Sequence, residues 1–378
     1  MRTLVLATLS LAIPPALAAQ TGQFVVRLGN DTLAIEQYTR TRDRLQGEQA
    51  VRSPRTVHRL YSATFGSGGA IARFELVTHN VSGAPGPAET RAGAEFTGDS
   101  AVVTVPRRDS TVTLRVKAGP GAVPFIGQGF GLIEEVTRRA RASGGARYTT
   151  TMLPLGDTEP MQVTVTARGA DSLTIVLGTI GPLRARVDAQ GTLLGLTGIG
   201  STMQVTVERT QGLDFAALGK AFAPRSLGVL SPPDSVKTSV AGAALTVRYS
   251  RPSTRGRAIF GNVVPWDQVW RTGANQATIF ETSTDLVIAG TAVPAGKYSL
   301  WILPTEDVWT LIVSNDWDTF HTNYRSRYDL GRVKMQKEKL SATVEQLTFT
   351  IEPNAAAPGG RIAMAWATTK VSVPFTVE

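Results

Sequence analysis

The chain has 378 residues, 42% of them hydrophobic and 18% charged, so it is long enough for two domains and too apolar for a disordered protein. The absence of Cys excludes a disulfide framework, a zinc ribbon, an iron–sulfur cluster and a thiol nucleophile. The formal net charge of +9 is spread along the chain without a basic stripe, so we expect no nucleic-acid partner.

The first 19 residues have the pattern of a bacterial export signal. Arg2 gives a cationic start, residues 4–13 are apolar, and residues 16–18 (Ala-Leu-Ala) match a small-x-small cleavage site. The apolar stretch is too short to span a bilayer, and no Cys follows it that could carry a lipid. We therefore expect residues 1–19 to be a signal peptide, with a buried N-terminal strand as the alternative. The mature chain is expected to be periplasmic or secreted, without a transmembrane span.

Residues 20–210 alternate apolar and polar side chains in short runs that end at turn residues, which is typical of antiparallel strands. One stretch, about 129–142, has helical spacing instead, and Gly144-Gly145 ends it. A long antiparallel sheet with one helix predicts a curved half-barrel whose concave face the helix covers. This architecture is similar to that of open-barrel periplasmic lipoprotein carriers, which would imply a lipophilic ligand beneath the helix. A fully packed interior is the alternative.

Residues 211–236 differ from what precedes them, because Pro224 and the run 231–233 (Ser-Pro-Pro) interrupt the alternation. We interpret 211–236 as a linker. Alternation resumes in residues 237–378, where about eight short strands separated by turn signals predict a β-sandwich of jelly-roll character. The whole chain is therefore expected to be mainly β.

An unusual polar segment lies near residues 249–278. Five Arg occur within 248–271, whereas few acids are close in sequence. Guanidinium groups grip carboxylates or phosphates through paired hydrogen bonds, and indole rings add stacking. This surplus of cations predicts a site for a small anionic ligand; the alternative is a structural corner in which loop carbonyls and acids neutralise each Arg. The candidate ligand-binding residues are Tyr249, Arg251, Ser253, Arg257, Trp270, Arg271 and Asn275.

The same segment resembles a known family. It reads Tyr-Ser-Arg-Pro-Ser at 249–253 and Val-Trp-Arg-Thr-Gly-Ala-Asn at 269–275, and the likeness continues through Ala-Gly-Lys-Tyr-Ser-Leu at 295–300. On these motifs residues 234–377 resemble the bacterial domain-of-unknown-function family 2911. The resemblance implies an exported β-rich domain and no particular activity. Gln276 stands where the family often has Glu, which weakens any carboxylate catalyst at that position.

Two Glu–Arg pairs in the predicted helix, Glu134–Arg138 and Glu135–Arg139, have i,i+4 spacing, which indicates a solvated helix surface. The glycines at 127–131 lack the strand–helix–strand context of a dinucleotide site. We expect neither a cofactor nor a metal site.

His321 lies close in sequence to Asp316 and Asp318, and a His–carboxylate pair can support acid–base chemistry. A solvated loop is the simpler interpretation, and no catalytic residue is assigned. We therefore favour an exported two-domain β protein that binds a small anionic or envelope-derived ligand without catalysis. The alternatives are a hydrolase-like enzyme that acts on a cell-envelope substrate through His321 and a lipophilic-ligand carrier that uses the first domain.

Overall fold

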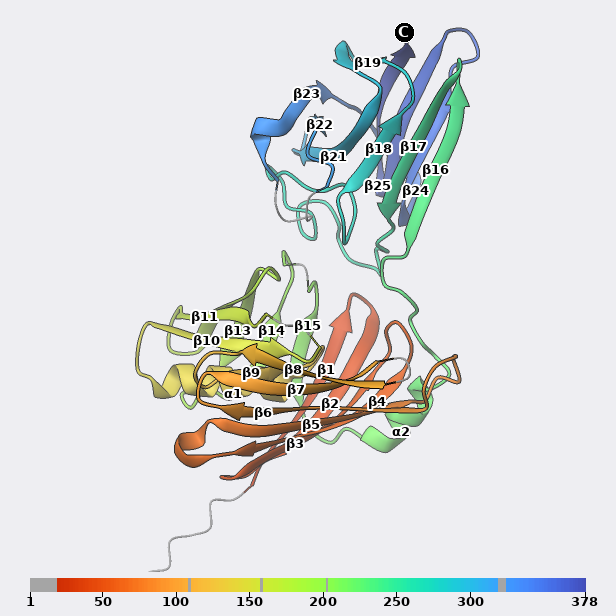
Figure 1. Ribbon diagram of the computed structural model, residues 1–378. Helices are drawn as coiled ribbons and strands as arrows, with labels where there is room; N and C mark the ends of the chain where they lie inside the picture. Colours follow the sequence, from red (N-terminus) through yellow and green to blue (C-terminus); the bar gives the residue numbers. More distant parts are fainter. Residues whose placement is uncertain (1–18, 108–109, 157–158, 202, 319–323) are drawn as a thin grey trace, which may run out of the picture.

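The computed structural model describes residues 19–107, 110–156, 159–201, 203–318 and 324–378. Two β regions are joined by a segment that contains a short helix (Figure 1). The predicted mainly β class is confirmed, because strands dominate both regions. Among the described residues, no helix combines the length and the apolar character needed to cross a membrane.

The first region is one sheet of 15 strands in the order β8-β7-β6-β5-β4-β3-β2-β1-β15-β14-β13-β12-β11-β10-β9. Neighbouring strands are antiparallel except β9 and β10, which are parallel. The strands are β1 (Gln20–Leu28), β2 (Asp31–Arg40), β3 (Arg44–Val51), β4 (Val57–Phe65), β5 (Ile71–Asn80), β6 (Glu89–Thr97), β7 (Ser100–Arg107), β8 (Ser110–Lys117), β9 (Val123–Phe125), β10 (Arg147–Pro154), β11 (Met161–Ala167), β12 (Ser172–Leu177), β13 (Pro182–Val187), β14 (Leu193–Thr197) and β15 (Thr206–Thr210), with a 3-10 turn η1 (Ser67–Gly69) before β5.

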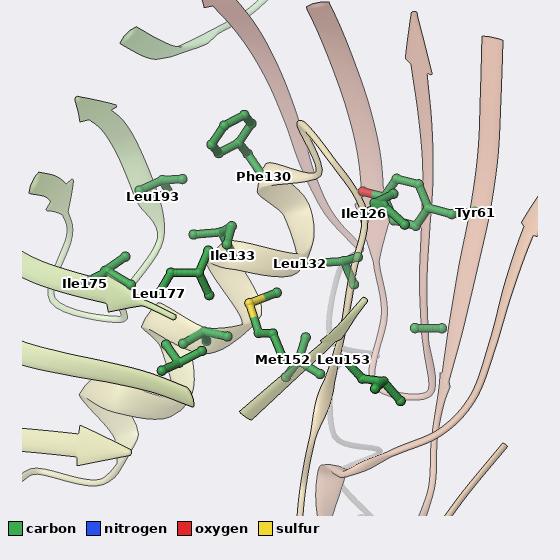
Figure 2. Packing of buried hydrophobic residues seen from close by; sticks show 14 of the residues in the cluster. Tyr61, Ile126, Phe130, Leu132, Ile133, Met152, Leu153, Ile175, Leu177 and Leu193 are labelled. Carbon is green, nitrogen blue, oxygen red and sulfur yellow. The ribbon is translucent and has the colours of Figure 1, made fainter. Parts of the chain in front are cut away.

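The period-2 pattern decides which face of each strand is buried. In β1, Phe24, Val26 and Leu28 are buried, and they belong to the core that also contains helix α1 (Phe130–Ala142). The helix lies within the predicted 129–142. Its buried side chains fill the interior: Figure 2 shows Ile133 on the side of Ile175 and Leu177, and Leu132 on the side of Ile126. The space beneath the helix therefore contains packed side chains.

The predicted linker 211–236 contains ordered structure. Helix α2 (Phe215–Phe222) begins after Asp214, whose carboxylate accepts a hydrogen bond from the amide of Ala217. Phe215 packs against Ile35 and Ala50, on the face of the sheet opposite α1. Strand β16 (Pro233–Val240) also starts inside the predicted linker, because a proline is tolerated as the first residue of an edge strand.

The second region contains two antiparallel sheets that share one core. Leu245 and Leu300 come from the first sheet, and Phe349 and Val373 from the second. The first sheet has the order β16-β17-β18-β21-β22-β23 and the second β20-β19-β25-β24. The remaining elements are β17 (Ala243–Ser250), β18 (Thr278–Thr282), β19 (Leu286–Ile288), β20 (Thr291–Val293), β21 (Gly296–Pro304), β22 (Trp309–Ser314), η2 (Ser326–Tyr328), β23 (Asp329–Lys334), β24 (Gln336–Pro353) and β25 (Gly359–Val377). The long connection between β17 and β18 holds the polar segment singled out from the sequence.

Candidate functional site

A cavity of about 630 Å³ lies between the two β regions. The β12–β13 and β14–β15 loops line it from the first region, and the long connection between β17 and β18 lines it from the second. Its described lining contains Arg255, Arg257 and Arg271 but neither Asp nor Glu. The volume lies in the range of small-molecule sites, and the lining is positively charged.

Contacts between the regions hold one wall of this cavity. The β1–β2 turn at Gly29-Asn30 meets the second region, where the amide of Asn30 donates to the carbonyl oxygen of Arg255 at 2.9 Å. Gly29 has φ +60°, and a Cβ there would collide with that same carbonyl group. The guanidinium of Arg255 forms an ion pair with Asp31. These contacts connect the cavity wall to the end of β1.

Hydrogen bonds to strand β21 hold the residues on both sides of Arg271. Trp270 and Ile302 exchange both backbone hydrogen bonds, at 2.7 and 2.8 Å. Thr272 is fully buried with φ +53°, and its hydroxyl donates to the carbonyl oxygen of Leu300 at 2.8 Å. A β-branched residue rarely adopts this conformation, and such residues persist only where their surroundings impose them. The backbone at Arg271 is therefore held firmly on both sides.

Arg271 is a partly buried cation without a counter-charge among the described residues. Its Nε atom is buried without a hydrogen-bond partner, and its side chain forms no ion pair or hydrogen bond with the part of the chain that the structure describes. Burial lowers the pKa of this guanidinium to about 10, and no neighbouring acid opposes that effect. The N–H donors on the two terminal nitrogens of the group are available to a ligand in the cavity, whereas the Nε–H is enclosed by the protein.

The other four Arg of the segment are engaged by the protein. The ion pairs are Arg248–Glu281, Arg251–Asp234 and Arg255–Asp31, and Arg257 donates to the carbonyl oxygens of Ser253 and Thr254 at 2.7 and 3.0 Å. Asp31 lies far away in the sequence, and Asp234 lies on the neighbouring strand β16. Neither acid is close in sequence to the arginine-rich segment, so the sequence alone does not pair them with its Arg residues. The surplus of cations is thereby reduced to Arg271 and to the unused donors of Arg257.

Five of the seven candidate ligand-binding residues come together in the cavity lining. They are Ser253, Arg257, Trp270, Arg271 and Asn275. The indole of Trp270 stacks on that of Trp366, with ring centroids 5.9 Å apart and planes at 15°. The Asn275 side chain donates to Ser231 and Ser250 at 3.2 and 3.3 Å, which ties the cavity rim to the connecting segment.

The other two candidates belong to the scaffold. Tyr249 is buried, and its hydroxyl accepts a hydrogen bond from the amide of Phe349 at 3.1 Å. Burial is the largest cause that raises the pKa of Tyr249. Arg251 donates to the Leu347 carbonyl at 3.1 Å and to the Thr348 hydroxyl at 2.9 Å. The two side chains, at the end of β17 and directly after it, therefore contact β24 instead of lining the cavity.

The proposed acid–base group is not assembled by the described residues. Asp316 accepts two hydrogen bonds from the guanidinium of Arg325, at 2.6 and 2.7 Å, and Asp318 is exposed. His321 lies outside the described residues.

The interpretation of Glu134 and Glu135 as a solvated helix surface is wrong, because both side chains are buried, with 1% and 3% exposed. Helix α1 lies inside the curve of the sheet, so these carboxylates face strands instead of water. The i,i+4 ion pairs are present, at 2.7 and 2.9 Å. The groups that contact the Glu134 carboxylate are the Tyr38 hydroxyl (2.5 Å), the Arg138 and Arg209 guanidinium groups (2.7 and 3.2 Å) and the Leu193 amide (3.1 Å).

A third buried carboxylate, Glu36 on β2, lies at the N-terminus of α1. It accepts hydrogen bonds from the amides of Phe130 and Gly131, at 2.6 and 3.2 Å, and from the Tyr61 hydroxyl at 2.6 Å. A negative side chain is favourable there because the first amides of a helix have no partner within it. Burial raises the pKa of Glu36 to about 7, against the opposing effect of these hydrogen bonds.

A larger groove, of about 890 Å³, follows β1–β5, β15 and the residues before α2. Its charged side chains have partners: Glu48, for example, contacts His58 at 2.6 Å and Gln37 at 2.8 Å. Among the described residues it offers no unpaired charge comparable to Arg271, so the smaller cavity between the regions is the better candidate site.

Sequence reasoning missed the contribution of the first region to the cavity, above all that of Gln204. A single Gln in a loop gives no signal of this kind. The burial of Glu36 did have a signal, because Ala34, Glu36 and Tyr38 alternate along β2 and therefore share a face.

Comparison with known proteins confirms the family resemblance of the second region. Residues 231–375 match the family described as "Protein of unknown function (DUF2911)". No curated relative matches the sequence. A DUF1089 family protein from Pseudomonas aeruginosa is similar in structure, with 12% identity over 44% of this chain and 90% of that one and a TM-score of 0.33. A β-barrel-like protein of the DUF1849 family from Brucella abortus shows 11% identity over 51% of this chain and 94% of that one, with a TM-score of 0.34.

Proposed function

We propose that the chain is an exported protein that binds a small anionic ligand, without catalysis, in the cavity between the two β regions. The observation that carries this proposal is Arg271, a cavity-lining cation without a counter-charge among the described residues. A buried charge without a partner is costly, and perturbed groups of this kind gather at functional sites. The signal pattern of residues 1–19 supports export to the periplasm or beyond.

The lining also indicates what kind of anion fits. Arg271 offers a planar fork for a carboxylate or a phosphate, and the unused nitrogen of Arg257 lies on the same lining. The absence of Asp and Glu from the described lining means that no carboxylate there repels the ligand. Met203, Leu230 and Trp270 add apolar surface. An envelope-derived fragment with an acidic group and an apolar part has this chemistry.

Calorimetry and thermal unfolding with inorganic phosphate and an alkyl phosphate test the proposal. A ligand present at a hundred times its Kd stabilises the folded state by about 2.7 kcal/mol. In Arg271→Met this stabilisation should disappear, while the ligand-free melting temperature stays equal or rises slightly, because an apolar side chain of similar length replaces a partly buried, unpaired charge.

Arg248→Met is the matched control, because Arg248 is exposed, forms an ion pair with Glu281 and lies outside the cavity. This variant should respond to the alkyl phosphate as the wild type does. Equal stabilisation of Arg271→Met by the anion would refute the proposal. A melting temperature many degrees lower in ligand-free Arg271→Met would instead assign Arg271 to the scaffold.

A further inference from the structure

The wall that the first region contributes to the cavity carries an unsatisfied group of its own. Gln204 adopts φ +55°, and its side-chain nitrogen donates to the carbonyl oxygen of Ser201 at 2.6 Å. Its side-chain oxygen is buried without a hydrogen-bond partner. Exchanging the two atoms would place an oxygen against the Ser201 carbonyl, so the observed orientation is the favourable one. A hydrogen-bond acceptor is thus left unused on this wall.

Hydrogen bonds within the loop hold the backbone near Gln204. The hydroxyl of Ser201 donates to the carbonyl oxygen of Gly198 and accepts from the amide of Met203 at 3.1 Å. The Gln204 oxygen itself has almost no exposed surface, so a ligand donor reaches it after a small shift of the Gln204 side chain toward the cavity. Leaving a buried acceptor unpaired costs free energy, so a ligand that supplies a donor gains the full benefit of the hydrogen bond.

We infer that the ligand of this cavity is an anion that carries a hydroxyl or N–H donor away from its charged group, and that it bridges the two β regions. This inference rests on the proposed function. Arg271 on one wall lacks an acceptor, and Gln204 on the other lacks a donor. A ligand with both groups satisfies both walls, and the apolar side chains of Met203, Leu230 and Val264 contact the part between them.

The test compares two series of probes of increasing chain length: alkyl phosphates and the corresponding ω-hydroxyalkyl phosphates. A terminal hydroxyl weakens binding in a cavity that lacks an acceptor, because the hydroxyl loses its water. With the Gln204 oxygen available, one length of the hydroxyl series should bind wild-type protein about tenfold more tightly than its alkyl counterpart by calorimetry.

Gln204→Leu should abolish this preference for the hydroxyl while the affinity for the plain alkyl phosphate stays within about twofold. Gln268→Leu is the matched control, because Gln268 lines the same cavity but is exposed and makes no hydrogen bond through its side chain to any described residue. It should retain the preference. Arg271→Met should bind neither the alkyl phosphates nor the hydroxyalkyl phosphates.

The possible failures are distinguishable. If wild-type protein binds alkyl phosphates through Arg271 but shows no hydroxyl preference at any length, the bridging ligand is refuted and the anion site stands. A preference that survives in Gln204→Leu also refutes the bridge. If neither series binds wild-type protein, the anion-binding function itself fails.

Discussion

Charged side chains that are shielded from water have different surroundings in the first β region and in the cavity between the regions. Around α1, the carboxylate of Glu134 contacts two guanidinium groups, a tyrosine hydroxyl and a backbone amide. In the cavity, Arg271 has no such partner among the described residues. A charged group that has all its hydrogen-bond partners within the protein stabilises one packing of the scaffold. A charged group without such partners can bind a ligand. The contrast separates structural from binding residues better than residue type does.

The largest effect should come from a substitution of Glu134, whose carboxylate has all its partners within the protein. Glu134→Gln replaces one carboxylate oxygen by an amide nitrogen, which then faces the donors of Leu193 or the surrounding guanidinium groups. We expect a loss of about 4 kcal/mol in the free energy of unfolding, measured with urea. Glu95→Gln, at an exposed ion pair, should change it by less than about 0.5 kcal/mol. Similar small losses in both variants would contradict the assigned role of Glu134.

A smaller effect, which depends on pH, should come from Glu36. Its pKa is raised from 4.5 to about 7 in the folded state, so the folded state holds a proton that the unfolded state has already released. The unfolding free energy should therefore decrease by roughly 3 kcal/mol as the pH rises from 4.5 to above 7.

The readout is the difference between wild-type protein and Glu36→Gln in urea titrations across that pH range. Because all other ionisable groups are common to the two proteins, subtraction leaves the contribution of Glu36. A difference that does not vary with pH would show that the carboxylate is ionised throughout and that the raised pKa is wrong.

The smallest effect should come from the ion pair between the regions. Asp31 is half-buried, and the backbone hydrogen bond between Asn30 and Arg255 persists without it. Asp31→Asn should therefore lower the unfolding free energy by less than about 1 kcal/mol. Alkyl phosphate affinity, measured by calorimetry, should change by less than about threefold. A complete loss of anion binding would instead show that the Asp31–Arg255 ion pair is needed to hold the cavity wall in its binding geometry.

The sequence predicted those parts of the fold that depend on the spacing of neighbouring residues. Alternation predicted the strands, helical spacing predicted α1 almost to its ends, and the motifs around Trp270 placed the second region in its family. These signals depend on neighbouring residues only. They do not report how the sheet curves, so Glu134 looked like a surface residue although the sheet encloses it.

The candidate site was predicted in part for the same reason. The sequence placed Arg271 within an arginine-rich segment but could not separate it from Arg255, whose counter-charge, Asp31, is 224 residues away. Tyr249 and Arg251 looked like ligand contacts because their partners on β24 are nearly a hundred residues distant. Gln204 belongs to the other β region and entered no local pattern.

The pairing of β1 with β15 has a consequence for engineering. Gln23 lies opposite Thr210, so the chain enters and leaves the first region at adjacent points. A short artificial connection could join these points, and new ends could be opened at an exposed hairpin such as the one around Gly83. The region would then become a circularly permuted module, which could be inserted into a host protein with its packed interior unchanged.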